Sequence, residues 1–91
     1  IVVCSSSEAM IAPEIDCVML GLKYVDHDKI KTNCEYVLQL HNKVIWRKVK
    51  YIDGYDIVLS PLNEVGFKDI HIDATDVVKA WEVSVKTSMP I

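Results

Sequence analysis

The 91-residue chain is poor in the residues that form phosphate-binding loops, with three glycines and three prolines. Its glycines are isolated at Gly21, Gly54 and Gly66, so neither a GxGxxG nor a GxxxxGK[ST] loop occurs. An HExxH metalloprotease motif is also missing. The sequence therefore excludes the common nucleotide-binding loops and this class of zinc site, and we expect no cofactor and no metal.

Long apolar runs are missing as well. The longest apolar stretch, residues 17–22 (CVMLGL), is far shorter than the roughly 20 residues that a membrane-spanning helix needs. The opening residues, IVVC, are too short for the core of a signal peptide and lack its basic lead. The chain does not begin with Met, so we expect it to be part of a longer protein with no membrane partner.

The chain has no excess of basic residues. Ten Lys and Arg against 13 Asp and Glu give a net charge of −3, and the isoelectric point is near 5.5. A nucleic-acid-binding domain normally carries a basic patch or a high isoelectric point, so we expect no direct DNA contact here. Hydrophobic residues make up 51% and charged residues 25%, which excludes intrinsic disorder and predicts one globular domain over residues 1–91.

Cysteine usage is irregular. Cys4, Cys17 and Cys34 are odd in number and show no CxxC spacing, and the three histidines are scattered. This pattern is a poor disulfide framework and a poor zinc site. It predicts reduced, mostly buried thiols and therefore a reducing compartment, the cytoplasm.

Strand patterns dominate the remaining sequence. Several short segments alternate apolar and polar residues or are rich in β-branched and aromatic side chains. Residues 5–16 are expected to form a loop, and residues 73–76 a turn or one helical turn. The expected strands are residues 17–22, 34–41, 43–52, 55–60, 68–73 and 77–86. The pattern predicts an all-β fold of mainly antiparallel strands, curled into a small barrel or sandwich.

The dipeptide Asp53-Gly54 is a strong hairpin signal between two of these strands. A two-residue turn at Asp53-Gly54 would pair Ile52 with Tyr55. One face of the hairpin would then carry Trp46, Ile52, Tyr55, Ile57 and Leu59. The opposite face would also be largely apolar, which predicts cover on both sides by other strands or by a partner chain.

Three polar segments could supply metal ligands or catalytic residues, but each has a simpler structural interpretation. Residues 26–28 (DHD) could bind a metal but are typical of a solvated turn. Asp69, His71 and Asp73 alternate as on the solvent face of an edge strand, with a carboxylate–histidine pair as the alternative. Residues 5–7 (SSS) could hold a nucleophile, but a serine needs a neighbouring base and the sequence places none beside it.

A series of motifs in a characteristic order covers most of the chain. These motifs are AMIAPEID (residues 9–16), EYVL (35–38), WRKV (46–49), Asp53-Gly54, LSPLN (59–63) and WEV (81–83). Over residues 7–86 the chain resembles the C-terminal domain of LexA-like self-cleaving peptidases and phage repressors. The resemblance implies a LexA/signal-peptidase-like β fold that pairs with itself through its C-terminal strands.

The two residues on which the chemistry of that family depends are replaced. Ala9 stands where the family has its serine nucleophile, and Arg47 stands where it has its lysine base. Arginine cannot act as a base, because its pKa lies above about 12. An extra residue between the Met and Pro of the first motif would allow a slipped alignment with Ser7 and Lys48 instead. However, Ser7 is not followed by Met, and Lys48 would lie on the opposite strand face, so we expect no catalysis.

The resemblance implies the oligomerisation and regulatory domain of a repressor-like transcription regulator, with a second copy as partner. DNA would be bound only through an N-terminal helix-turn-helix domain outside this chain. Two alternatives remain: an active self-cleaving Ser–Lys peptidase, present here as a fragment or as a mutant in which Ala9 is an engineered change, and an unrelated small β-barrel interaction module. The expected dimer contacts are Val77, Val78, Trp81, Val83 and Val85.

Overall fold

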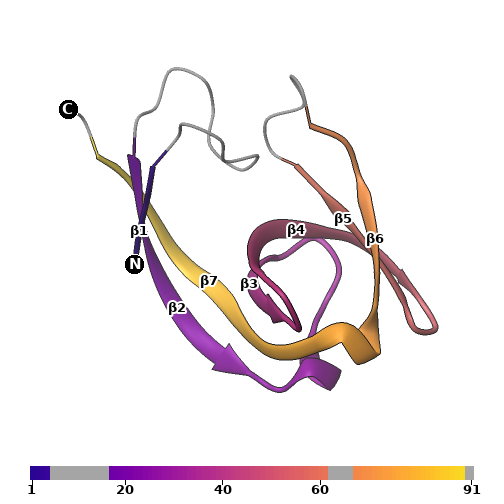
Figure 1. Cartoon of the computed structure of the whole chain (residues 1–91). Helices are drawn as coiled ribbons and strands as arrows, with labels where there is room; N and C mark the ends of the chain where they lie inside the picture. The colour runs from indigo at the N-terminus through magenta and orange to yellow at the C-terminus, as the bar shows by residue number, and fades with distance from the viewer. Residues whose placement is uncertain (5–16, 62–66, 90–91) are drawn as a thin grey trace.

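The computed structural model contains one antiparallel sheet of seven strands, in the order β1-β2-β7-β3-β4-β5-β6 (Figure 1). It describes residues 1–4, 17–61 and 67–89. The strands are β1 (Val2–Cys4), β2 (Cys17–Val25), β3 (Glu35–Leu40), β4 (Val44–Asp53), β5 (Asp56–Ser60), β6 (Ile70–Asp73) and β7 (Val77–Met89). Two 3₁₀ turns, η2 (His27–Lys29) and η3 (Ala74–Asp76), complete the described elements. The predicted all-β class is confirmed.

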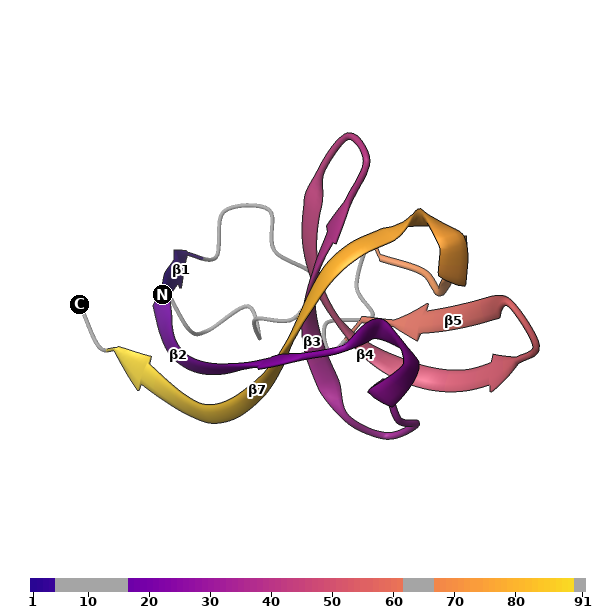
Figure 2. The same cartoon turned by 90° about the horizontal axis from the view of Figure 1, so that it is seen from below.

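The sheet is strongly curled. Figures 1 and 2 show β2 and β7 side by side on one side of the molecule, with β5 and β6 on the other. Although β3 and β4 separate β7 from β5 in the sheet, Ala80 of β7 and Leu59 of β5 belong to the same buried cluster. The described strands therefore form one sheet bent around a core, not a sandwich of two sheets. Register shifts on three strand pairs assist the bending, because bulges increase local twist.

Two hydrophobic clusters occupy the two faces of the central strand β3. Along β3, Tyr36 and Leu38 point into the first cluster, and Val37 points into the second. The first, larger cluster has the buried members Ile30, Tyr36, Leu38, Leu40, Val49, Ile57, Leu59, Val77 and Ala80. The second has the buried members Val18, Leu20, Val37 and Trp46. A strand buried on both faces needs apolar residues on both, and Tyr36, Val37 and Leu38 supply them in the middle of the alternating segment.

The turn of the β4–β5 hairpin lies one residue later than predicted, so the predicted strand register is wrong by two residues. The turn is formed by Gly54 and Tyr55, so that Ile52 pairs with Ile57. Gly54 has a positive φ of 61° and Tyr55 does not, as in a type II′ turn with glycine at the first central position. Glycine is favoured there because it adopts a positive φ without steric cost.

A bulge in β4 also changes the predicted faces of this hairpin. The register shifts between Val49 and Tyr51, so that Val49 lies opposite Leu59. Val49 therefore joins Leu59 in the first cluster, whereas Trp46 lies in the second. The prediction of a single face shared by Trp46 and Leu59 is wrong, because one inserted residue reverses the side-chain alternation beyond it.

The expectation of reduced thiols is wrong for Cys17, which is disulfide-bonded. The pairing of β1 with β2 places Cys4 opposite Cys17 in the register, whereas Cys34 is free and half-buried. Strand pairing, not sequence spacing, decides which cysteines meet. Disulfides are typical of oxidising compartments, so the cysteines give no support to a cytoplasmic location. Among the described residues, no helix is long and apolar enough to cross a membrane.

Candidate functional site

Arg47, the residue at the position of the expected lysine base, lies on β4 opposite Tyr36. Its Nη1 donates a hydrogen bond to the carbonyl oxygen of Lys68 at 3.3 Å. Its guanidinium carbon lies 5.9 Å from the centre of the Phe67 ring. Arg47 therefore fastens β4 to the segment before β6, a role that suits a planar and permanently charged group.

The other residues of the expected catalytic constellation do not assemble in the described structure. Ser7 and Ala9 lie outside the described residues. Lys48 is exposed and follows Arg47 in the same strand, so it points to the opposite face. Ser60 Oγ donates a hydrogen bond to the backbone carbonyl oxygen of Lys48 at 3.5 Å.

The polar segment at β6 makes exposed contacts between polar side chains. β6 is an edge strand of the described sheet, and its His71 and Asp73 are exposed, as the sequence predicted. His71 Nδ1 lies 3.0 Å from Asp56 Oδ2 on the neighbouring strand. Lys50 Nζ lies 2.7 Å from Asp69 Oδ2. The carboxylate partner of His71 is therefore neither of the two aspartates that alternate with it.

Asp73 caps the 3₁₀ turn η3. Its Oδ1 accepts hydrogen bonds from the backbone N–H of Thr75 at 2.9 Å and from the Thr75 hydroxyl at 2.7 Å. These two bonds hold the pKa of the Asp73 carboxyl below its ordinary value. The carboxylate is therefore ionised and fixed in place near neutral pH.

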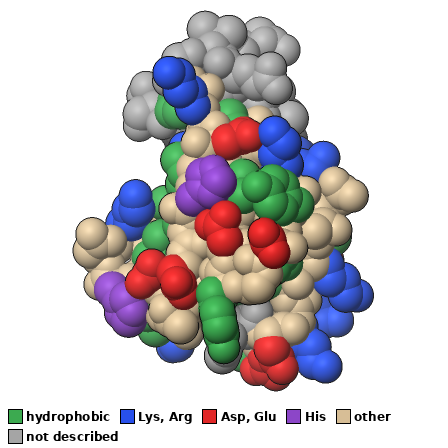
Figure 3. All heavy atoms as spheres, turned by 90° about the vertical axis from the view of Figure 1, so that its right-hand side faces the viewer, with side chains coloured by type: hydrophobic (Ala, Val, Ile, Leu, Met, Phe, Trp, Pro, Cys, Tyr) green, Lys and Arg blue, Asp and Glu red, His purple; other side chains and the backbone are tan. Residues whose placement is uncertain are grey.

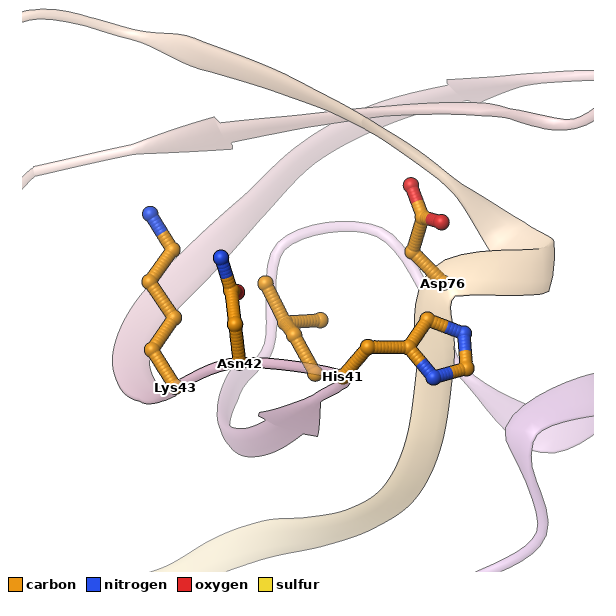
Figure 4. A pocket seen from close by; sticks show the side chains of 5 residues that line it. His41, Asn42, Lys43 and Asp76 are labelled. Atoms are coloured by element: carbon orange, nitrogen blue, oxygen red, sulfur yellow. The ribbon is translucent and has the colours of Figure 1, made fainter.

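A pocket of about 380 Å³ lies between the β3–β4 turn and η3 (Figure 4). Its polar lining residues are His41, Asn42, Lys43 and Asp76, all exposed. Figure 4 shows Lys43 and Asn42 on one side of the pocket and Asp76, above the His41 ring, on the other. Within the described ranges, no group of three or more His, Cys, Asp or Glu residues could hold a metal ion. The His41 and Asp76 side chains of this pocket are therefore not part of such a group.

The C-terminal strand β7 has two distinct halves. From Val77 to Glu82 it pairs with β3 on one side, and from Ala80 onward it pairs with β2 on the other. Among the described strands, residues 83–89 pair with β2 alone. The second half of β7 therefore carries one edge of backbone groups without a described strand partner.

The residues expected to form a dimer contact have different environments along β7. Val77 is buried in the first core cluster, so its side chain does not reach the surface. Trp81 and Val83 are half-buried against the second cluster. The rings of Trp81 and Tyr24 pack edge to face, with their centres 6.2 Å apart. Val78 is 44% exposed and Val85 is 59% exposed. Of these residues, Val85 is both highly exposed and located on the half of β7 with the open edge.

A bulge separates Val85 from the residues that precede it. The β2–β7 register shifts at Gly21 and Leu22, so that Gly21 lies opposite Val85 and Leu22 opposite Val83. Ser84 Oγ donates to the Gly21 carbonyl at 3.1 Å and holds the bulge. The uniform alternation expected over residues 81–85 therefore ends here, and Val85 points to the face opposite Val83. A Cβ at Gly21 would lie 3.2 Å from the Val85 Cβ, so glycine allows this close approach.

The sequence did not indicate the contact that holds β7 where it leaves β3. Glu35 accepts hydrogen bonds from Trp46 Nε1 at 3.0 Å and from Lys86 Nζ at 2.9 Å. Lys86 Nζ also lies 5.9 Å from the centre of the Trp46 ring. Three distant segments meet here, so no local spacing could have revealed the cluster.

Comparison of the chain with known proteins identifies no relative, since no family model, curated protein or solved structure matches it.

Proposed function

We propose that this chain is the oligomerisation and regulatory domain of a repressor-like transcription regulator and that it is catalytically silent. The edge of β7 over residues 83–89, which has no second strand partner within the described part of the chain, carries the proposal. Arg47 adds support, because a guanidinium held by Phe67 and Lys68 cannot serve as the base of a Ser–Lys pair.

Self-association would occur by antiparallel pairing of two β7 edges around a two-fold axis. Backbone N–H and C=O groups of residues 83–87 would bond to the same groups of a second copy, which removes the unpaired edge. Val85 would meet its counterpart near the axis, since its side chain is exposed at this edge. A two-fold dimer matches a palindromic operator, and a separate domain of the longer protein would make the DNA contacts.

The test is the mass of the domain in solution, measured by light scattering over a concentration series. Val85→Glu places two like charges at the proposed axis and should convert a concentration-dependent dimer into a monomer. Val44→Glu is the matched control, because Val44 is similarly exposed (63%) but lies on β4. A wild-type protein that stays monomeric at high concentration, or equal effects of both substitutions, would overturn the proposal.

The disulfide at Cys17 favours a second candidate, a β interaction module of an oxidising compartment. The two candidates differ in the oxidation state of the protein in the cell, since a cytoplasmic regulator is kept reduced. Alkylation in cell lysate followed by intact mass measurement counts the reactive thiols. Labelling of Cys34 without Cys17 would favour the interaction module, and labelling of all three cysteines would favour the regulator.

A further inference from the structure

The peptide bond between Asp53 and Gly54 lies at the exposed tip of the β4–β5 hairpin. Asp53, Gly54 and Tyr55 are all exposed. A Cβ built on Gly54 would have no atom within 4 Å, so the side of Gly54 that a side chain would occupy is open. The hairpin ladder is closed by Asp53 and Asp56, and the two turn residues lie outside it. The Gly54 nitrogen therefore sits beside a carboxyl group and is not engaged in the strand ladder.

The two sides of this hairpin tip are held unequally. β4 pairs with β3 over residues 44–48, so among the described strands Asp53 pairs with β5 alone. Its partner Asp56 pairs with β6 on the other side. The Tyr55 carbonyl oxygen also accepts a hydrogen bond from the Ala74 backbone N–H at 2.7 Å. The β5 side of the tip is therefore anchored twice, whereas the β4 side opens when one residue pair breaks.

The pair that closes the hairpin joins two like charges. Asp53 lies directly opposite Asp56, and Asp73 lies opposite Asp56 on the next strand, β6. Figure 3 shows acidic side chains gathered on this side of the molecule, with Lys and Arg mostly toward its margins. Like charges directly opposite one another destabilise strand pairing, and His71 beside Asp56 offsets this repulsion only when it is protonated. Opening of the Asp53–Asp56 pair therefore costs little free energy.

Asp53 is also the one aspartate in the sequence that is followed by glycine. A Cβ on the following residue hinders approach of its nitrogen to the aspartate side chain, and glycine has no Cβ. Asp73 is the contrasting case. It is followed by Ala74, and its carboxylate is fixed by two hydrogen bonds from Thr75.

We propose that Asp53 is a site of spontaneous isoaspartate formation. The Gly54 nitrogen attacks Cγ of the Asp53 carboxyl group, so that a C–N bond forms and a C–O bond breaks. The released oxygen leaves as water with the amide proton and one proton from solvent, and a five-membered succinimide ring remains. Water then opens the ring and returns one carboxylate and one proton. Cleavage between nitrogen and the main-chain carbonyl carbon leaves Gly54 attached through Cγ, whereas cleavage at Cγ restores aspartate.

The isoaspartyl linkage changes the surface at this end of the hairpin, because it adds one carbon to the main chain. A second pocket, of about 340 Å³, lies where η2, the β4–β5 turn and η3 meet. Ile52, Gly54 and Tyr55 line part of it, so a longer main chain at the turn alters its wall. The inference does not depend on the proposed regulatory function.

The test is incubation of the whole chain at neutral pH and physiological temperature, followed by tryptic digestion. Trypsin releases residues 51–68, which contain Asp53, and residues 69–79, which contain Asp73. Electron-transfer fragmentation distinguishes the two linkages, because the main chain breaks differently at the extra carbon. Isoaspartate should accumulate at Asp53 and not at Asp73. The rate should lie within about tenfold of that in a capped, unfolded peptide of residues 50–57, since fraying ends open at free energies near zero.

Variants separate the role of the fold from that of the dipeptide. Asp56→Asn removes the opposing charge and should slow isoaspartate formation at Asp53 about twofold to fivefold, because the terminal pair closes more firmly. Asp76→Asn is the matched control, because Asp76 is exposed but lies outside the strand pairs that join Asp53, Asp56 and Asp73. It should leave the rate unchanged. Asp53→Glu keeps the charge but cannot close a five-membered ring, and it should abolish the reaction.

Three results would each overturn the proposal. The first is an unmodified folded chain under conditions in which the unfolded peptide converts. The second is equal accumulation of isoaspartate at Asp53 and Asp73. The third is a rate that Asp56→Asn leaves unchanged or that Asp76→Asn lowers by the same factor.

Discussion

The two halves of β7 differ in their strand neighbours and in the core cluster beneath them. The first half, from Val77 to Glu82, pairs with β3 and contributes Val77 and Ala80 to the larger core cluster. The second half pairs with β2 alone among the described strands, and the cluster beneath it has four buried members against nine in the first. A single continuous strand therefore serves as a core element at one end and as an open edge at the other. Stability and self-association should consequently respond to substitutions in different halves.

The largest expected effect comes from shortening a core side chain beneath the first half. Leu38, which pairs with Ala80, is completely buried, and Leu38→Ala should lower the free energy of unfolding by about 3–5 kcal/mol. Leu20, which pairs with Lys86 in the second half, lies in the smaller cluster, and Leu20→Ala should cost about 2–3 kcal/mol. Urea unfolding monitored by tryptophan fluorescence measures both. A larger loss for Leu20→Ala would contradict the ranking of the two halves.

A pH-dependent effect should follow from Tyr36, which pairs with the last residue of the first half, Glu82. Burial raises the pKa of Tyr36 above its ordinary value of 10.0, and the hydroxyl oxygen accepts a hydrogen bond from the Lys31 backbone N–H at 2.9 Å. The neutral phenol is favoured in the folded state. This preference for the neutral phenol adds fully to the stability of the fold below pH 10.0. The added stability is lost as the pH rises through the higher pKa of Tyr36 in the folded state.

Tyr36→Phe removes both the titration and the hydrogen bond. It should lower stability by about 1 kcal/mol at neutral pH and flatten the loss of stability above pH 10.0. Denaturant unfolding at neutral and alkaline pH tests this, with Tyr51→Phe as the control because Tyr51 is exposed. An unchanged alkaline profile in Tyr36→Phe would show that another group causes the loss.

A smaller effect should come from the ion pair that fixes the second half of β7. Lys86→Gln removes the charge that contacts Glu35 and the Trp46 ring and should cost about 0.5–1 kcal/mol at low salt. Lys50→Gln is the matched control, because the side chains of the Lys50–Asp69 pair are more exposed than those of the Lys86–Glu35 pair. Its cost should be below about 0.5 kcal/mol. If both substitutions cost similar amounts of stability and both costs vanish at high salt, the contacts of Lys86 with Glu35 and Trp46 stabilise the fold no more than an ordinary surface ion pair does.

The last prediction is that the chain does not cleave itself. Incubation at alkaline pH, where a lysine base would be most active, should leave the chain intact, because Arg47 cannot give up its proton. Mass spectrometry over time detects any discrete fragment. Fragments that disappear on Ser7→Ala would contradict the silent-domain proposal and support an active peptidase.

Local patterns were sufficient where contacts are local in sequence. The alternation in residues 34–41 predicted β3, and the Asp-Ala-Thr-Asp segment predicted the turn that became η3. The hairpin at Gly54 was also predicted, but its register was not, because moving the turn by one residue leaves the local sequence pattern equally favourable. The bulges at Lys50 and Ser84 were not predictable, because they depend on the partner strand.

The sequence by itself determined the all-β class, the main strands and the absence of a lysine at position 47, since period-two patterning and residue identity are properties of the chain alone. Only the tertiary structure decided that β7 lies between β2 and β3 and that, among the described strands, it pairs with β2 alone beyond Glu82. It also decided that Cys17 is disulfide-bonded and that three aspartates form a row across β4, β5 and β6. These features join residues far apart in the chain, and such pairings are selected by the burial of a shared core rather than by any local preference.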